Sequence, residues 1–584
     1  MRTISFARCT AMILGVMVWS LPGSVRAENS GAVVYHRISE GEEVEGAAKR
    51  VLIQQDGLSR LYEVPTGTPI AMAPQELSYF DFGARRTIQT AKLPDGSRCT
   101  VMTALDSLPP LAMTDERETI LGHECIKATT EIRSNKIEVW LIRDVGITGS
   151  PTTSVAAEGG LILKLVQNGS SGLLAERIET DPQAVAQLLS EQPQPFRPAD
   201  WGEEVDSAEY RARITDSYVT TITVFDEVQL SFGNEIHNPA ESDSGAVFHY
   251  SKGTVAVRRV TLPEVDDETM ILAELVEVSN GDAYDRTGSI FLIPTDRTHT
   301  YLDGLRDGVE ALPALDLQNG AYQGIAATED YLPPLELIRF ITPFGVGAFN
   351  SRSKVRGLEW ADEARYVMDV TDLAGSLQGS VWIGAFIGNY DKGGHKVTLR
   401  LRYFPGEQVE SETPPARRFT LPLFNTVNAM EMSGQNYGTL FGSDSLSAEF
   451  DLPNGIEDLQ LRYITTGHGG WGGGDEFNPK VNTILLDGQV ASSFVPWRSD
   501  CGTFRENNPS SGNFWNGISS SDFSRSGWCP GTTVSPYVVP LAGLVPGRHR
   551  IQVAIPLGER EGSAFSSWNV SGVLVGRFAD PEQP

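Results

Sequence analysis

The glycine-rich segment 467–477 combines the residue types that bind a sugar. It carries Trp471, Glu476 and Phe477 among its glycines, and a block that begins at Arg525 follows further along the chain. Glycine lets the backbone approach a ligand closely, while aromatic rings offer stacking faces and charged side chains supply hydrogen bonds and proton transfer. This mixture is typical of a carbohydrate site. Because glycines surround Trp471, we expect its ring to be the exposed platform.

The segment Tyr284-Asp285-Arg286 places a carboxylate between an aromatic ring and a guanidinium group. It follows the apolar run 270–278, from which it is separated by a connection that contains Asp282. Aspartate in such a connection is more often a turn former than a catalyst. The residues alone therefore favour turn formation for Asp282 and Asp285, with catalysis by Asp285 as the alternative.

Other common chemistries find little support in the sequence. The eight histidines show neither H-x-H nor H-E-x-x-H spacing, which disfavours zinc proteases and copper monooxygenases. His468 near Asp475 and Glu476 could ligate a cation, but a lone histidine is usually structural. The chain also contains no G-K-[ST] phosphate loop and no G-x-S-x-G elbow. We expect no metal and no cofactor.

The N-terminus has the pattern of a secretory signal. Arg2 and Arg8 precede the apolar run 11–19, and Val25-Arg26-Ala27 provides the small residues of a cleavage site. A membrane anchor is the alternative, but the apolar run is shorter than the roughly 20 residues that span a bilayer. We therefore predict a signal peptide at 1–27, no membrane span, and a secreted or periplasmic protein.

Four cysteines remain after the predicted cleavage, and an even number in an exported chain usually indicates disulfides. Three pairings are possible. Proximity in the sequence favours Cys99 with Cys125 and Cys501 with Cys529. Each bridge would stabilise the fold by about 3 to 4 kcal/mol in the chain-entropy model.

The overall charge narrows the possible partners. The chain has 47 Lys and Arg against 75 Asp and Glu, for a formal net charge of -28. Nucleic acid and anionic lipid would be repelled, whereas a neutral oligosaccharide would not. Solubility of an exported protein explains the acidity equally well. We expect a monomer.

The periodicity of the chain predicts an all-β protein in several domains. Apolar residues alternate with polar ones over 397–403, 459–463 and 551–555, and Asp487-Gly488 is a strong hairpin turn. Helical signals are scarce, apart from one helix that begins at Pro182. Proline-rich linkers at 193–198 and 405–418 delimit domains at 28–195, 208–405 and 419–580. Many short strands with Gly and Pro punctuation indicate β-sandwiches.

Five segments resemble motifs of the peptide:N-glycosidase F family and occur in the same order. They are 284–286, 339–347, 368–373, the glycine-rich segment 467–477, and 525–531. The resemblance covers roughly residues 215–578. It implies two adjacent antiparallel jelly-roll β-sandwiches and an enzyme that cuts N-linked glycans from asparagine side chains. The N-terminal domain resembles the bowl-shaped accessory domain of longer family members, and we expect no catalysis from it.

The resemblance also implies roles for single residues. Asp285 takes the main catalytic position, where it would bind or deprotonate the attacking water or act on the amide directly. Arg286 would orient the site and, with Arg525, offset negative charge in the transition state. Glu476 is implied to contact the first N-acetylglucosamine and that water. The rings expected to stack on sugar faces are those of Tyr284, Trp471, Phe477 and Trp528, although Trp528 could instead cover the disulfide of Cys529.

This chain departs from the family pattern at two points. Asp475 stands before Glu476, where a cysteine clamp is implied, so the loop must be held in another way. We expect Asp475 itself to be a solvated loop carboxylate. The family's third acid falls on Gly384, and Asp391 is a weak substitute. The sequence therefore predicts an exported peptide-N4-(N-acetyl-β-glucosaminyl)asparagine amidase, which acts on N-glycoproteins or glycopeptides and converts Asn to Asp. A glycan-binding protein that has lost catalysis is the alternative.

Overall fold

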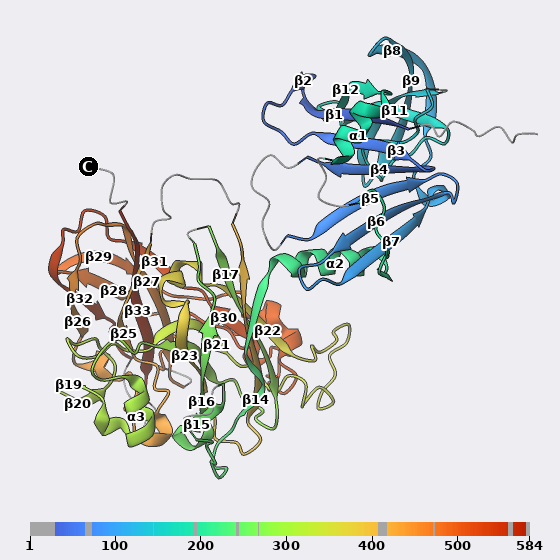
Figure 1. Cartoon of the computed structure of the whole chain (residues 1–584). Helices are drawn as coiled ribbons and strands as arrows, with labels where there is room; N and C mark the ends of the chain where they lie inside the picture. The colour runs from blue at the N-terminus through green and yellow to red at the C-terminus, as the bar shows by residue number, and fades with distance from the viewer. Residues whose placement is uncertain are drawn as a thin grey trace, which may run out of the picture. The chain divides into compact units, whose positions relative to one another are not determined.

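The chain forms two compact units, Met1–Ser217 and Tyr218–Pro584 (Figure 1). The computed structural model describes residues 30–64, 73–143, 145–190, 195–240, 245–266, 268–406, 417–470, 473–558 and 565–579. The predicted signal peptide and Trp471 lie outside the described residues. Among the described helices, none is both long and apolar enough to cross a membrane.

The first unit is built on one long β-sheet of thirteen strands, antiparallel except where β13 pairs with β7. In sheet order the strands are β13 (Glu203–Glu204), β7 (Arg98–Ala104), β6 (Arg86–Lys92), β5 (Gln75–Asp81), β4 (Leu58–Glu63), β3 (Arg50–Gln55), β1 (Gly31–Ser39), β12 (Ser171–Glu179), β11 (Gly160–Gln167), β10 (Asn135–Arg143), β9 (His123–Ile132) and β8 (Ala112–Ile120), with β2 (Glu42–Glu43) beside β1. The helices are η1 (Leu105–Ser107), α1 (Pro182–Ser190) and α2 (Ser207–Tyr218). Helix α1 begins at the predicted proline and packs Val185 against the sheet.

The predicted disulfide between Cys99 and Cys125 is wrong, because both thiols are free and buried. Cys99 lies on β7 and Cys125 on β9, and eight strands separate β7 from β9 in the sheet. A disulfide needs its two Cα atoms within about 7 Å, and neighbouring strands are already about 4.8 Å apart. Cys99 and Cys125 are therefore near each other in the sequence but far apart in the sheet.

The first sandwich of the second unit has a four-stranded and a six-stranded sheet. The four strands are β14 (Thr220–Leu230), β24 (His395–Phe404), β17 (Met270–Ser279) and β22 (Ala364–Asp369). The six are β15 (Val247–Tyr250), β16 (Val255–Leu262), β23 (Gly379–Ile387), β18 (Thr287–Ile293), β21 (Leu335–Ile341) and β30 (Thr532–Val534). Helix α3 (Tyr301–Asp307) packs on the outer face of the six-stranded sheet, around Phe291. The short helices are η2 (Ser251–Gly253), η3 (Val309–Ala311) and η4 (Thr371–Ser376).

The second sandwich has two four-stranded sheets around its own apolar core. One contains β25 (Arg418–Asn425), β33 (Ser567–Phe578), β27 (Ile456–His468) and β31 (Tyr537–Pro540). The other contains β26 (Leu446–Leu452), β32 (Gly547–Ala554), β28 (Asn482–Leu486) and β29 (Gln489–Phe494). Outside these sheets lie β19 (Ala314–Leu317), β20 (Gly320–Gln323), η5 (Glu431–Ser433), η6 (Leu440–Gly442), η7 (Cys501–Asn507) and η8 (Ser520–Asp522). We keep 208–405 and 419–580 as the proposed limits of the two sandwiches.

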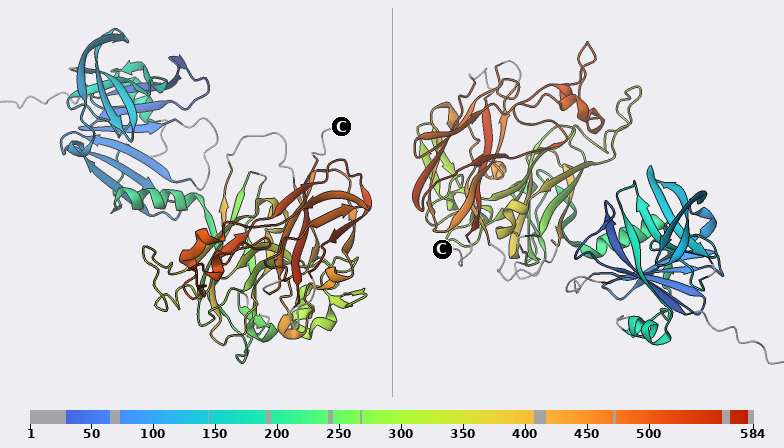
Figure 2. Two further views of the ribbon diagram at one scale, coloured as in Figure 1. Left: turned by 180° about the vertical axis from the view of Figure 1, so that it is seen from behind. Right: turned by 90° about the horizontal axis from the view of Figure 1, so that it is seen from above.

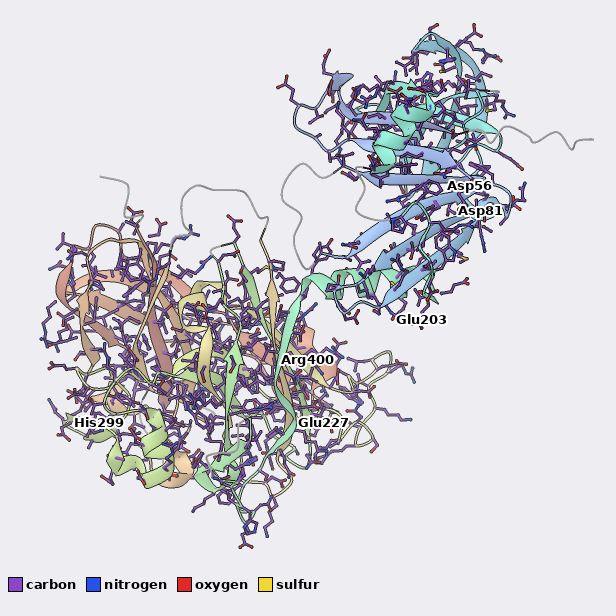
Figure 3. The ribbon with its side chains drawn as sticks, in the orientation of Figure 1. Asp56, Asp81, Glu203, Glu227, His299 and Arg400 are labelled. Atoms are coloured by element: carbon purple, nitrogen blue, oxygen red, sulfur yellow. A yellow bond between two sulfur atoms is a disulfide. The ribbon has the colours of Figure 1, made fainter. Side chains whose placement is uncertain are left out.

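The alternation predicted for 397–403 and 551–555 is confirmed. In 459–463 the polar residue Arg462 is buried as well, because it donates to the carbonyls of Glu336 and Leu337. On β24 the apolar residues are buried, whereas Arg400 of β24 and Glu227 of β14 lie on the same sheet without full burial (Figure 3). The turn Asp487-Gly488 joins β28 to β29 with positive φ at both residues, as its type requires. The predicted all-β fold, in which a separate β-rich unit precedes two adjacent jelly rolls in the sequence, is correct.

The two sandwiches are joined by a shared strand and a buried ionic cluster. Strand β30 of the later segment pairs with β21 of the first sandwich, and Figure 2 shows the two sandwiches side by side. Arg339 on β21 is fully buried and donates to both carboxylate oxygens of Glu336, at 2.6 and 2.7 Å. It also donates to Thr466 Oγ1 and the Asn569 carbonyl, while Ser571 donates to Glu336. These bonds hold the sandwiches in one register, so residues from both can form one site.

Candidate active site

Asp285 lies in the connection between β17 and β18, two residues before β18 begins. The backbone on either side of it is tied to Thr342, which follows β21. Arg286 N donates to Thr342 Oγ1 at 2.8 Å, Thr342 N donates to the Arg286 carbonyl at 2.8 Å, and Thr342 Oγ1 donates to the Tyr284 carbonyl at 3.2 Å. These hydrogen bonds continue the pairing of β18 with β21 beyond the start of β18 and the end of β21. Asp285 is therefore presented from a fixed backbone rather than from a loose turn.

Asp475 holds the loop that carries Glu476. Its carboxylate accepts hydrogen bonds from Trp568 Nε1 at 2.9 Å and Gly558 N at 2.8 Å, and its carbonyl accepts one from Ser526 Oγ at 2.6 Å. The side chain is fully buried, so our interpretation of Asp475 as a solvated carboxylate is wrong. It replaces the cysteine clamp that the sequence lacks.

Arg525 is held on a short antiparallel bridge with Arg498, beside the disulfide between Cys501 and Cys529. Its side chain is 2 % exposed, and its guanidinium group lies 5.0 Å from the centre of the Phe477 ring and 4.8 Å from that of Trp528. Arg525 Nη1 donates to the carbonyl of Phe523 at 3.1 Å. This enclosure keeps a permanent positive charge in one place.

The two acids singled out in the sequence meet at Arg525. Arg525 Nε lies 2.9 Å from Glu476 Oε1, and Arg525 Nη2 lies 3.8 Å from Asp285 Oδ2. A cleft of about 400 Å³ is lined by all three residues, together with Phe344, Gly470, Phe477, Gly512, Asn513, Phe514 and Ser520. Asp285 belongs to the first sandwich and Glu476 to the second. The cleft therefore lies where the sandwiches join.

Both carboxyl groups are harder to ionise than usual. Burial raises the pKa of Asp285, against the opposing charges of Arg525 and Arg286. Burial and then the charge of Asp285 raise the pKa of Glu476 to about 7, despite the hydrogen bond from Arg525. Water still reaches the cleft, because 18 % of the Asp285 side chain and 20 % of the Glu476 side chain are exposed. Near neutral pH this pair can exchange protons with a reactant.

Arg286 is anchored from behind by a buried acid. Its Nε donates to Asp282 Oδ2 at 2.7 Å, and the Asp282 side chain is 1 % exposed. His395 Nε2 lies 3.7 Å from the same oxygen, and His395 Nδ1 lies 2.7 Å from Glu277 Oε1. Burial opposes ionisation of Asp282, but His395 and Arg286 outweigh it and lower its pKa to about 2. Asp282 forms a turn with Tyr284 N, as predicted, but it is also the anchor of Arg286.

His468 is a structural residue rather than a cation ligand. Its Nε2 is 2.8 Å from Thr466 Oγ1, and its ring stacks on Trp528. Burial lowers the pKa of His468 to about 3, so it is neutral. Among the described residues, one group has metal-ligand spacing, Asp500 with Cys501 and Cys529, but its sulfurs are joined in the disulfide.

Comparison with known proteins accounts for nearly the whole described chain. Residues 221–403 match the family model described as Peptide-N-glycosidase F, N terminal, and residues 436–575 match Peptide-N-glycosidase F, C terminal. Residues 33–200 match the N-glycanase peptide, N-terminal domain. The structure of PNGF-II in a P21 crystal is 39 % identical, with a TM-score of 0.83, over 94 % of this chain and 99 % of that one. This chain belongs to the peptide-N-glycosidase F family.

Two further comparisons complete this picture. PNGF-II in a C2 crystal is also 39 % identical, with a TM-score of 0.80 over 95 % of this chain and 99 % of that one. A structure of peptide-N(4)-(N-acetyl-β-D-glucosaminyl) asparagine amidase is 18 % identical, with a TM-score of 0.43 over 62 % of this chain and 97 % of that one. None of the curated protein sequences matches this chain.

This family member has no room for an acid at position 384. Gly384 on β23 pairs with Phe291 on β18, and a Cβ atom at 384 would lie 2.4 Å from the Phe291 ring. That ring belongs to the apolar cluster under α3. Asp391, the possible substitute, accepts from the amides of Gly393 and Gly394 and so closes a turn.

The predicted aromatic residues differ in their exposure. Tyr284 is 61 % exposed, and Phe477 lines the cleft. Trp528 is 3 % exposed and donates through Nε1 to the Gly467 carbonyl at 2.9 Å. The prediction that Trp528 stacks on substrate is therefore wrong, because its faces are covered by His468 and Arg525. Trp528 instead packs against the guanidinium group of Arg525 and helps to hold it in place.

Sequence reasoning missed two parts of the site. His395 was missed because it is the first residue of the alternating strand β24, and a lone histidine carries no signal of its partners. The segment 512–520 was also missed, although its Phe514-Trp515 pair between glycines is as unusual as the glycine run around Trp471. Both became recognisable only once their neighbours were known.

Proposed function

We propose that this protein is an exported amidase that hydrolyses the side-chain amide of glycosylated asparagine. The products would be the released N-glycan, as a glycosylamine, and an aspartate in the polypeptide. One observation carries the proposal: Asp285 and Glu476, from different sandwiches, meet at the buried Arg525 in a single cleft. The predicted signal peptide and the disulfide of Cys501 with Cys529 support export.

Asp285 is the general base of the proposed reaction. A water molecule bound to its carboxylate attacks the amide carbon of the substrate and gives its proton to Asp285. Because the raised pKa of Asp285 brings it closer to neutral pH, the carboxylate is a stronger base than an exposed aspartate. General base catalysis of this kind contributes roughly 10² to 10⁴ in rate.

Glu476 supplies the proton that the leaving nitrogen needs. With a pKa of about 7 it carries a proton in a large fraction of molecules near neutral pH. In the proposed step the carbon–nitrogen bond breaks, the nitrogen takes this proton, and the proton on Asp285 returns through water to Glu476. Water has then added across the amide, and both acids have recovered their initial states. As the resemblance to the family implies, the Glu476 carboxyl would also bond to the first sugar.

The arginines stabilise the negative charge that forms on the amide oxygen. Arg525 is buried and already faces both acids, so little reorganisation is needed when charge appears. Arg286 lies over the rings of Tyr284 and Tyr390, at 5.2 and 5.5 Å from their centres, and Asp282 fixes its orientation. Phe477 and Tyr284 offer apolar faces to the sugar.

Glycan release from a denatured glycoprotein tests the function. We expect the wild-type protein to release glycans and to convert the carrier asparagine to aspartate, as mass spectrometry of the peptide would show. Asp285→Asn should lower the rate by at least about 10²-fold, since it removes the base. Asp391→Asn is the matched control, because Asp391 closes a turn by accepting from Gly393 and Gly394.

Two results would contradict the proposal. Binding of the glycoprotein without release would identify a glycan-binding protein on the same scaffold. Full activity in Asp285→Asn would show that another group activates the water.

A further inference from the structure

One wall of the cleft is a short hairpin, residues 512–520, which we call the apolar hairpin. Asn513 and Ser519 form an antiparallel bridge, Phe514 N donates to the Ile518 carbonyl at 2.8 Å, and Gly517 N donates to the Phe514 carbonyl at 2.9 Å. Asn516 Oδ1 accepts from Ile518 N at 3.1 Å. The tip is therefore a closed, hydrogen-bonded turn.

The tip of the apolar hairpin exposes large apolar side chains to water. Trp515 is 97 % exposed, and Phe514 and Ile518 are each 41 % exposed. Trp515 is the most exposed of the large apolar residues among those that the structure describes. Such a cluster on a structured turn contributes nothing to the core, and exposed apolar patches of this kind mark binding sites.

The base of the apolar hairpin is fixed to the catalytic groups. Ser519 Oγ donates to Ser511 Oγ at 2.6 Å, and both serines are buried. The Phe514 ring packs edge-on against Phe523, 5.3 Å away, and the Phe523 carbonyl accepts from Arg525. Phe514 lines the same cleft as Asp285 and Glu476. A ligand held by the tip would thus extend directly into the reactive centre.

The apolar hairpin differs in character from the wall that carries Glu476 and Arg525. The side chain of Asn513 already accepts from Arg505, that of Asn516 caps the turn, and Ser520 Oγ is 2.9 Å from Ser511 Oγ. The side-chain oxygens of Asn513, Asn516 and Ser520 are therefore engaged within the protein. Sugar hydroxyls need hydrogen-bonding partners, and Glu476 and Arg525 offer charged ones, whereas the side-chain oxygens of the tip already have partners. Apolar side chains of a polypeptide suit the tip.

We propose that the apolar hairpin binds the polypeptide that flanks the glycosylated asparagine, with Trp515 as its main contact. This inference rests on the proposed function, since that reaction requires a substrate with a sugar arm and a peptide arm leaving the cleft in different directions. The peptide must present apolar side chains near the asparagine, as an unfolded segment does. Trp515 is then a specificity-determining residue, which acts on substrate choice and takes no part in the chemistry.

Two glycopeptides with the same glycan test this role. One carries a single residue on each side of the asparagine, and the other carries several flanking residues that include Leu and Phe. Trp515→Ser should lower kcat/KM for the long peptide about tenfold more than for the short one, through KM, as expected for truncating an aromatic anchor in an interface. Trp515→Phe should recover most of the loss. Val490→Ser is the control, because Val490 is 63 % exposed on β29, outside the cleft.

Binding to an inactive variant separates this inference from the proposed function. In Asp285→Asn, fluorescence anisotropy of the labelled long glycopeptide should show about tenfold weaker binding when Trp515→Ser is added. This readout remains valid even if the wild-type protein releases no glycan, in which case only the proposed function fails. Equal losses of kcat/KM for the short and the long peptide would indicate that Trp515 contacts the glycan. Unchanged binding of the long glycopeptide would show that the apolar hairpin does not bind the flanking polypeptide. Either result overturns the inference. Matching thermal unfolding of the variants excludes misfolding.

Discussion

The charge state of Glu476 is the most quantitative consequence of this site, and Glu476→Gln tests it. Gln keeps the shape and much of the hydrogen bonding of the protonated acid but cannot ionise. Burial, and then the charge of Asp285, raise the pKa of Glu476 from 4.5 to about 7. Ionisation of Glu476 therefore lowers the free energy of unfolding of the wild type, whereas Glu476→Gln has no such loss.

The sign follows from the two pKa values. Between pH 4.5 and about 7 the unfolded chain has released the Glu476 proton while the folded protein still holds it. The contribution of Glu476 to the stability of the wild type therefore falls as the pH rises through this window and stays level above it. At about 1.4 kcal/mol per pKa unit the loss is about 3 kcal/mol. Glu476→Gln lacks this loss, so its stability relative to wild type should rise by about 3 kcal/mol between pH 4 and pH 8.

Urea unfolding of both proteins at several pH values measures this difference. At each pH, the free energy of unfolding of the wild type is subtracted from that of the variant. The change of this difference with pH is then compared, because any constant effect of the substitution cancels. Glu449→Gln is the matched control, since Glu449 pairs with Arg548 at the surface and is 55 % exposed. Its relative stability should change by less than about 1 kcal/mol. A difference for Glu476→Gln that is flat across pH would refute the raised pKa and, with it, the role of Glu476 as proton donor.

Two further predictions concern the supports of the site. Asp475→Ala removes the buried acceptor of Trp568 Nε1 and should cost about 1 to 3 kcal/mol, with a larger fall in kcat than Asp391→Ala, as thermal unfolding and glycan-release assays would show. An equal activity in both variants would mean that the Glu476 loop is held without Asp475. The double variant Cys501→Ser, Cys529→Ser opens a loop of sequence separation 28 and should cost about 3 to 4 kcal/mol, measured by urea unfolding. Stability that does not respond to a reductant in the wild type would contradict this.

The candidate site was predictable to the extent that single residues carried their own signal. Asp285, Glu476 and Arg525 were predicted because short motifs around them resemble those of the family, and the structure brings the three residues together within one cleft. Their surroundings were not predictable. Asp475 has the same residue type as many exposed loop acids, and only the position of Trp568, far along the chain, makes it a buried clamp.

The sequence by itself determined the all-β character, because alternation along a strand is a local property that each segment displays, as in 397–403. It also determined the hairpin at Asp487-Gly488, whose residue types accept positive φ. The tertiary structure alone decided which cysteines can pair, since strand order separates Cys99 from Cys125. It alone decided the burial of Trp528 and the raised pKa of Glu476. Burial and electrostatic coupling depend on groups that are distant in the sequence, and no local pattern encodes them.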